Sequence, residues 1–236
     1  MKALIPALPA MMVAALSVQA EQPVSPSFDC NKAQTQDERA ICSDTRLAEL
    51  DQAASIAYGQ AELKYKDEAL ATARDALASR HSCGGDRMCI LDQQVNEIEN
   101  FSSWGSQVPV PPWVGAYRIN LFKGRSELPT QTLPNRIAQC TVTRIASIST
   151  RFGHELNPGT VEGSQVTFAD GGLQVSYGYE PDLANSHIGD EVLLCLVSTP
   201  KDCPPGDDRG KIYSGTNLKT TGWWLLPDAQ HSCGGA

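Results

Sequence analysis

The residues of this chain best suited to chemistry are its eight cysteines, which fall into two sets of four. Thiols form disulfides in an oxidising compartment, whereas in the cytoplasm they more often bind metals or act as nucleophiles. A proline-rich stretch, residues 108–112, separates the two sets. The even split predicts two modules, each closed by two disulfides. The cysteines are Cys30, Cys42, Cys83, Cys89, Cys140, Cys195, Cys203 and Cys233.

Two other patterns could bind a metal ion. The pentapeptide His-Ser-Cys-Gly-Gly occurs at residues 81–85 and again at 231–235, but it lacks the paired Cys-x-x-Cys clips of a structural zinc site. Asp202, Asp207 and Asp208 lie close together without the alternating oxygen ligands of a calcium loop. We therefore interpret these cysteines as disulfide partners and the aspartates as a solvated loop, and we expect neither a metal site nor a cofactor.

The sequence offers no catalytic constellation. It contains no G-x-S-x-G nucleophile motif, phosphate-binding loop or dinucleotide fingerprint, and its four histidines lie far apart. Exposed indoles at Trp223 and Trp224 could stack on sugars, but neighbours in a strand point to opposite faces, so at least one should be in the core. We predict that the protein is not an enzyme and assign no catalytic residue; a hydrolase of another type is the alternative.

The first 20 residues are typical of a signal peptide. Lys2 provides a positive charge, an apolar run follows from residue 3 to 16, and residues 18–20 end in alanine. No later segment approaches the about 20 apolar residues of a membrane span, and the first cysteine, Cys30, comes too late to carry a lipid anchor. We expect a mature chain that starts at Glu21, has no membrane anchor and is periplasmic or secreted.

Negative charge is concentrated in the first half of the mature chain. Residues 21–105 contain 15 acidic and 8 basic side chains, whereas the remainder contains 12 and 10. Such a surface repels phosphate backbones, so nucleic acid is not an expected partner, whereas a cationic protein is. The plainer interpretation is that the charge only keeps the protein in solution.

The first module has the spacing of three amphipathic helices, at residues 44–65, 67–81 and 86–101. Ser43 or Asp44 could cap the first helix, and Gly84-Gly85 ends the second. Antiparallel packing of the first two helices would return Cys83 to the neighbourhood of Cys42. We therefore favour disulfides that cross between segments 30–42 and 83–89 over two local loops, although four cysteines allow three pairings.

The second module alternates like strands bounded by turn residues. The turn Asp170-Gly171-Gly172 predicts a hairpin, and the fully apolar run 192–197 predicts a central strand covered on both faces. These patterns favour a small all-β barrel or sandwich of five to seven strands with Cys140–Cys195 and Cys203–Cys233 as its bridges. The expected strands are residues 113–122, 137–148, 165–168, 173–179 and 192–197, with further edges at 212–213 and 223–226.

Residues 27–101 carry a more specific pattern. It begins with Phe28-Asp29-Cys30, continues after eleven residues with Cys42-Ser43-Asp44, and ends with Leu50-Asp51. This opening resembles the LprI-like family, named after a lysozyme inhibitor. A second block of the family pattern matches Arg74, Leu77, Ala78, Arg80, Cys83 and Cys89. The chain departs from that pattern at Ala76, Gln94 and Glu97, where the family usually has tryptophan, tyrosine and arginine.

The resemblance implies an exported, helical, disulfide-bonded domain that binds and blocks lysozyme or another cationic wall-degrading enzyme. Two alternatives remain: a cell-envelope glycan-binding protein or hydrolase acting through the second module, and an envelope stress protein that binds no lysozyme. The second module resembles only uncharacterised exported bacterial proteins. The expected organisation is a signal peptide at 1–20, a helical domain at 27–104, a linker at 105–113 and a β-rich domain at 114–236.

Overall fold

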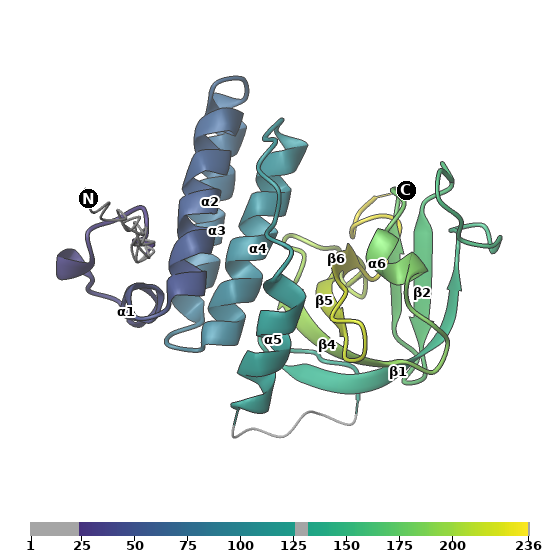
Figure 1. Cartoon of the computed structure of the whole chain (residues 1–236). Coiled ribbons are helices and arrows are strands. Elements are labelled where there is room, and N and C mark those ends of the chain that lie inside the picture. The colour runs from purple at the N-terminus through teal and green to yellow at the C-terminus, as the bar shows by residue number, and fades with distance from the viewer. Residues whose placement is uncertain (1–23, 126–131, 236) are drawn as a thin grey trace, which may run out of the picture.

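The computed structural model describes residues 24–125 and 132–235, so the signal peptide predicted at residues 1–20 lies outside the described residues. A bundle of helices is followed by a curled six-stranded antiparallel sheet (Figure 1). Within the described ranges, no helix is long and apolar enough to cross a membrane. The helical elements are η1 (Cys30–Lys32), α1 (Gln36–Cys42), α2 (Thr45–Glu62), α3 (Lys66–Ser82), α4 (Arg87–Ser103), α5 (Val114–Lys123) and α6 (Pro181–Ala184). The strands are β1 (Cys140–Ser149), β2 (Ser164–Phe168), β3 (Leu173–Ser176), β4 (Glu191–Ser198), β5 (Ile212–Asn217) and β6 (Trp223–Pro227).

The three predicted helices of the first module are confirmed as α2, α3 and α4. Asp44 is the residue that caps α2, and its carboxylate accepts hydrogen bonds from the amides of Arg46 and Leu47. The α3 helix ends before Gly84, whose φ of 56° is the left-handed conformation that glycine adopts readily. Leucines and alanines of α2 interdigitate with apolar residues of α4 to form the core of the bundle.

The predicted crossed disulfides of the first module are wrong: Cys30 pairs with Cys42, and Cys83 pairs with Cys89. The two segments do lie side by side as expected, because Arg87 Nη2 donates a hydrogen bond of 3.2 Å to Ser43 Oγ. However, the unpredicted α1 returns Cys42 to Cys30, and the tight α3–α4 turn brings Cys89 to Cys83. Each bridge therefore closes a local loop.

The predicted strand at residues 113–122 is also wrong, because this segment forms α5. Val114, Tyr117 and Leu121 recur at the spacing of one helical face and pack against the core of the bundle. Pro111 helps to start the helix, since its carbonyl accepts the Val114 amide at 3.2 Å. A segment of ten residues with this mixture of apolar and polar side chains fits either period, so packing against α4 decides between helix and strand.

The other expected strands are confirmed with small changes in their ends, in the order β3-β2-β1-β4-β5-β6. The β4 strand is buried on both faces along six consecutive residues, as its apolar run predicts. The sheet curls until a side chain of one edge strand reaches the other end of the sheet: Gln174 of β3 donates through Nε2 to the carbonyls of Tyr213 on β5 and Leu226 on β6. Cys140–Cys195 and Cys203–Cys233 are both confirmed. The six-stranded antiparallel sheet is thus a half-barrel.

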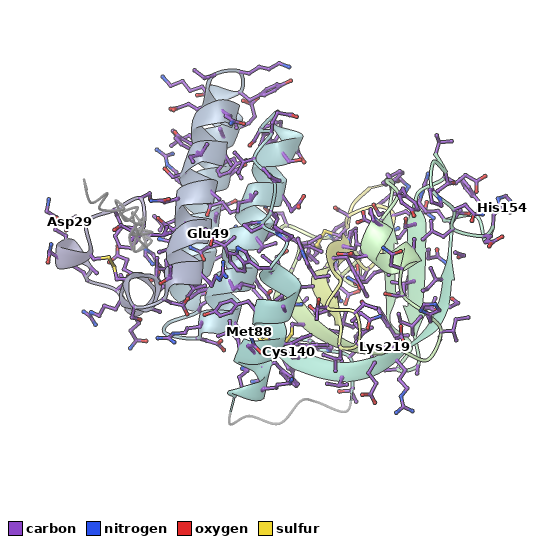
Figure 2. All side chains as sticks on the ribbon, viewed as in Figure 1. Asp29, Glu49, Met88, Cys140, His154 and Lys219 are labelled. Atoms are coloured by element: carbon purple, nitrogen blue, oxygen red, sulfur yellow. A yellow bond between two sulfur atoms is a disulfide. The ribbon has the colours of Figure 1, made fainter. Side chains whose placement is uncertain are left out.

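The helices and the sheet share a buried junction (Figure 1). Arg118 of α5 forms a two-pronged ion pair with Asp92 of α4, with contacts of 2.8 and 3.2 Å, and is 1% exposed. The same guanidinium donates to the hydroxyls of Ser214 and Thr216 on β5. Figure 2 shows Met88 of α4 next to Cys140, and these two residues pack in one apolar cluster with Cys195.

The proline-rich segment lies against the helical core as well. Val108, Val110 and Trp113 pack on it, and Trp113 Nε1 donates 2.9 Å to Glu49 Oε1. A cut after residue 105 would therefore remove core residues from the bundle. Gly115 brings α5 close to the sheet, because a Cβ there would lie 2.0 Å from the Thr221 carbonyl oxygen.

Candidate functional site

Three charged residues within the family-like segment, Asp37, Asp51 and Arg80, hold its helices together. Asp37 and Asp51 are 1% and 5% exposed. Arg80 on α3 joins them, donating 3.0 Å to Asp37 and 3.3 Å to Asp51. Asp51 also accepts 2.6 and 2.8 Å hydrogen bonds from Ser27, which fixes the N-terminal segment on α2. These three residues thus account for the packing of three helices, α1, α2 and α3, and are not available to a partner.

Glu97 faces this same network. Burial raises the pKa of Glu97 to about 7, the positive charge of Arg80 opposes that rise, and the negative charge of Asp51 adds to it. When Glu97 is ionised, the negative charges of the network therefore outnumber its positive charges.

Most of the residues considered above as possible metal or sugar ligands serve the fold too. Cys83 and Cys233 of the repeated pentapeptide are both in disulfides, so neither offers a thiolate to zinc. Asp207 pairs with Arg209 at 2.8 Å, and this hydrogen bond, with one from the Gly234 amide, lowers the pKa of Asp207. Asp208 pairs with Lys211. These aspartates tie down the C-terminal loop.

The two tryptophans do not form an exposed platform. Trp224 is 2% exposed and donates 2.8 Å to Gln174 Oε1 inside the half-barrel. Its indole lies so close over Gly215 that a Cβ there would be 2.3 Å from Trp224 Nε1. Trp223 points the other way and packs against the helical core, where it remains half-buried. The prediction that at least one indole is in the core is confirmed.

Trp223 instead forms one wall of a pocket where the bundle meets the sheet. We call it the junction pocket; it holds about 200 Å³ and is lined by Glu99, Glu180, Asp182, Trp223, Trp224 and Leu225. Glu99 comes from α4, Glu180 and Asp182 from the start of α6, and the apolar residues from β6. Asp182 is held in place by a 2.9 Å hydrogen bond from the Trp223 amide, and Glu180 by 2.6 Å from Ser176 Oγ.

The three carboxylates of the junction pocket are not neutralised. Within residues 24–125 and 132–235, none of them forms an ion pair. Burial raises the pKa of Glu180, and the charges of Glu99 and Asp182 raise it further. Although part of the Glu99 side chain is in solvent, the protein packed around it also raises the pKa of Glu99. A cationic group entering the pocket would relieve this repulsion.

Sequence reasoning missed the junction pocket because no local pattern marks it. Its acids come from residues 99, 180 and 182, which meet only because α4 packs beside β6 and α6. The sequence contains one indication of a surface site: Trp223 is next to a core tryptophan in a strand pattern, so its side chain should point away from the core of the sheet. No family model, no curated protein and no solved structure matches this chain.

Proposed function

We propose that the chain is an exported binding protein that inhibits lysozyme or another cationic wall-degrading enzyme by receiving a basic side chain in the junction pocket. One observation supports this proposal above all: Glu99, Glu180 and Asp182 line a single pocket and have no cationic partner within the described residues. The four disulfides are typical of a protein in an oxidising compartment, where such enzymes act.

The contrast with the other acids of the bundle strengthens this argument. Asp37, Asp51 and Asp92 are buried and each pairs with an arginine of the chain itself. Their charges are therefore used internally and cannot attract a partner. The acids of the junction pocket differ because a neutralising group must come from outside the described residues.

A lysine or arginine of the partner would be stabilised both by the carboxylates and by the Trp223 indole of the junction pocket. Charge-assisted hydrogen bonds contribute about 1.5 to 3 kcal/mol each where water is excluded. The Trp223 indole adds a ring face on which a guanidinium can stack. The net charge of the whole sequence, -8, would steer a strongly cationic enzyme toward the protein before these contacts form.

The test measures lysis of cell-wall substrate by c-type and g-type lysozymes with the whole mature chain, residues 21–236, at micromolar excess. The expected result is inhibition, weakened about tenfold or more in the double variant Glu99→Gln/Glu180→Gln, a change of about 1.4 kcal/mol. The control is Glu68→Gln/Glu155→Gln, which makes the same change in charge at two exposed positions. Undiminished lysis with the native chain would refute the proposal, and equal loss in both double variants would refute the role of the pocket.

A glycan hydrolase is the second candidate, because Glu99 and Glu180 line one pocket. Burial raises the pKa of Glu180, and the charge of Glu99 adds to that rise. Two carboxyl groups on either side of a glycosidic bond can act as acid and base there. This candidate predicts that the chain alone releases reducing sugar from cell-wall substrate and that Glu180→Gln abolishes the release. Inhibition of lysozyme without any release would exclude it.

A further inference from the structure

A second surface feature lies at the end of the sheet farthest from α2 and α3, where Figure 2 labels His154 in the loop between β1 and β2. The guanidinium carbon of Arg151 is 4.2 Å from the ring centre of Tyr177 and 5.1 Å from that of Phe152. Both rings are strongly exposed, Phe152 at 63% and Tyr177 at 58%. We call Arg151, Phe152 and Tyr177 the aromatic platform.

Hydrogen bonds hold the aromatic platform in place. Arg151 donates from Nε to the Glu162 carbonyl at 3.0 Å and from Nη1 to Gln230 Oε1 at 3.3 Å. The Tyr177 hydroxyl donates 3.0 Å to the Gln230 carbonyl. Hydrogen bonds to Glu162 and Gln230 therefore fix Arg151 and the Tyr177 ring, and Phe152 lies against the ordered guanidinium. A surface whose side chains are already ordered loses less conformational freedom when it binds.

Gly163 makes this arrangement possible. Its φ of 75° is in the left-handed region, and a Cβ there would lie 2.8 Å from Arg151 Nε and 2.1 Å from the Ser176 carbonyl oxygen. Any side chain at this position would push the arginine away from the rings. The backbone thus provides the space in which the guanidinium lies.

The polar surroundings of the platform are suited to hydroxyl groups. The Nη2 group of Arg151 has no hydrogen-bond partner within the described residues and remains free to donate. His154 Nδ1 lies 2.8 Å from the Glu162 carboxylate, which leaves its Nε2 as a second polar group nearby. The charges of Arg151 and Glu162 offset each other, so the patch attracts neither a polyanion nor a polycation strongly.

We propose that the aromatic platform binds a neutral glycan chain. The C–H face of a pyranose ring carries partial positive charge and packs on the faces of Phe152 and Tyr177 that Arg151 does not cover. The hydroxyls at the edge of the same sugar accept from Arg151 and bond to His154. Exposed aromatic surface of this kind otherwise costs solubility, and a rigid, ordered set of rings marks a binding surface. This site is separate from the junction pocket and does not depend on it.

The test is a titration of the whole mature chain with two probes, a β-1,4-linked tetramer of N-acetylglucosamine and one of glucose, followed by calorimetry and by saturation transfer from protein to sugar in NMR. We expect saturable binding of at least one tetramer with a dissociation constant below about 1 mM. Comparison of the two tetramers shows whether the acetamido groups of N-acetylglucosamine strengthen or weaken binding. Phe152→Ala should weaken binding about tenfold, and Phe152→Trp should retain it, because a larger ring still stacks.

Ile188→Ala is the matched control, since Ile188 is 71% exposed in another loop and its replacement should leave binding unchanged. Phe152 is a surface side chain, so its variants should unfold at the same denaturant concentration as the native chain. The proposal is overturned if neither tetramer binds at millimolar concentration, or if Phe152→Ala and Ile188→Ala have the same effect. Junction pocket variants should bind the tetramers normally, which separates this result from the outcome of the lysozyme assay.

Discussion

Replacing Arg118 by methionine should destabilise the whole chain, because it removes the only cation paired with the buried Asp92 carboxylate among the described residues. Asp92 is 5% exposed and would keep one hydrogen bond, 3.1 Å from Ser214 Oγ. Breaking a buried ion pair by removing one partner costs about 3 to 5 kcal/mol. A native domain is stable by about 5 to 15 kcal/mol, so the loss is a large share of the total. For a chain of this size it lowers the melting temperature by about 6 to 20 °C.

The assay is unfolding in guanidinium chloride with the disulfides intact. Far-UV circular dichroism follows the helices, and tryptophan fluorescence follows the bundle through Trp104 and Trp113 and the sheet and junction through Trp223 and Trp224. Both signals should change together in the native chain, since the pair connects α4 and α5 to β5. The double variant Arg118→Met/Asp92→Leu should recover most of the lost stability, because neither charge then remains buried.

Arg144→Met provides the control. Arg144 pairs with Glu191 at 2.9 Å, but the two side chains are 65% and 51% exposed, so the loss should stay below about 1 kcal/mol. The reasoning would be refuted if Arg118→Met were as mild as Arg144→Met, or if the double variant were less stable than the single one. Two separate transitions would show that the junction does not couple the halves.

Two further outcomes are expected. The pKa of Glu97 is raised from 4.5 to about 7 in the folded chain. The contribution of the protonated Glu97 to the free energy of unfolding is therefore complete below pH 4.5 and is lost as pH rises through 7. Glu97→Gln should be more stable than the native chain by about 2 to 3 kcal/mol at pH 8 and equally stable at pH 4; identical pH profiles of the unfolding midpoint for the two chains would contradict this. Replacing both cysteines of a bridge by alanine should lower the free energy of unfolding by about 2 kcal/mol at Cys83–Cys89 and by about 4 kcal/mol at Cys140–Cys195, because the loops that the bridges close span 6 and 55 residues. Chemical denaturation measures both losses. A larger loss at Cys83–Cys89 would argue against loop entropy as the cause of the difference.

Local signals explain why much of the fold could be predicted. The helices α2 and α4 follow from apolar residues at every third or fourth position, and Asp44 and Asp86 supply the caps that start them. The β2–β3 hairpin follows from Asp170-Gly171-Gly172, where Gly171 has a φ of 89°. Each of these features is decided by residues that are near one another in the sequence.

The features that escaped prediction depend on contacts between distant residues. The α5 helix is ten residues long and becomes helical by packing on α4 and beside Thr221. Arg118 looks like an ordinary surface arginine in the sequence, yet it is buried against Asp92 and Ser214. The junction pocket and the aromatic platform arise in the same way, because their side chains come from segments far apart along the chain.

The pairing of the cysteines has a consequence for the order in which the disulfides can form in an oxidising compartment. The bridges join the first cysteine to the second, the third to the fourth, the fifth to the sixth and the seventh to the eighth, so no loop encloses or crosses another. A chain that crosses a membrane from its N-terminus presents each cysteine to its proper partner next. Oxidation in order of emergence therefore yields the native set, and maturation should require an oxidant but no isomerase to rearrange wrong bridges.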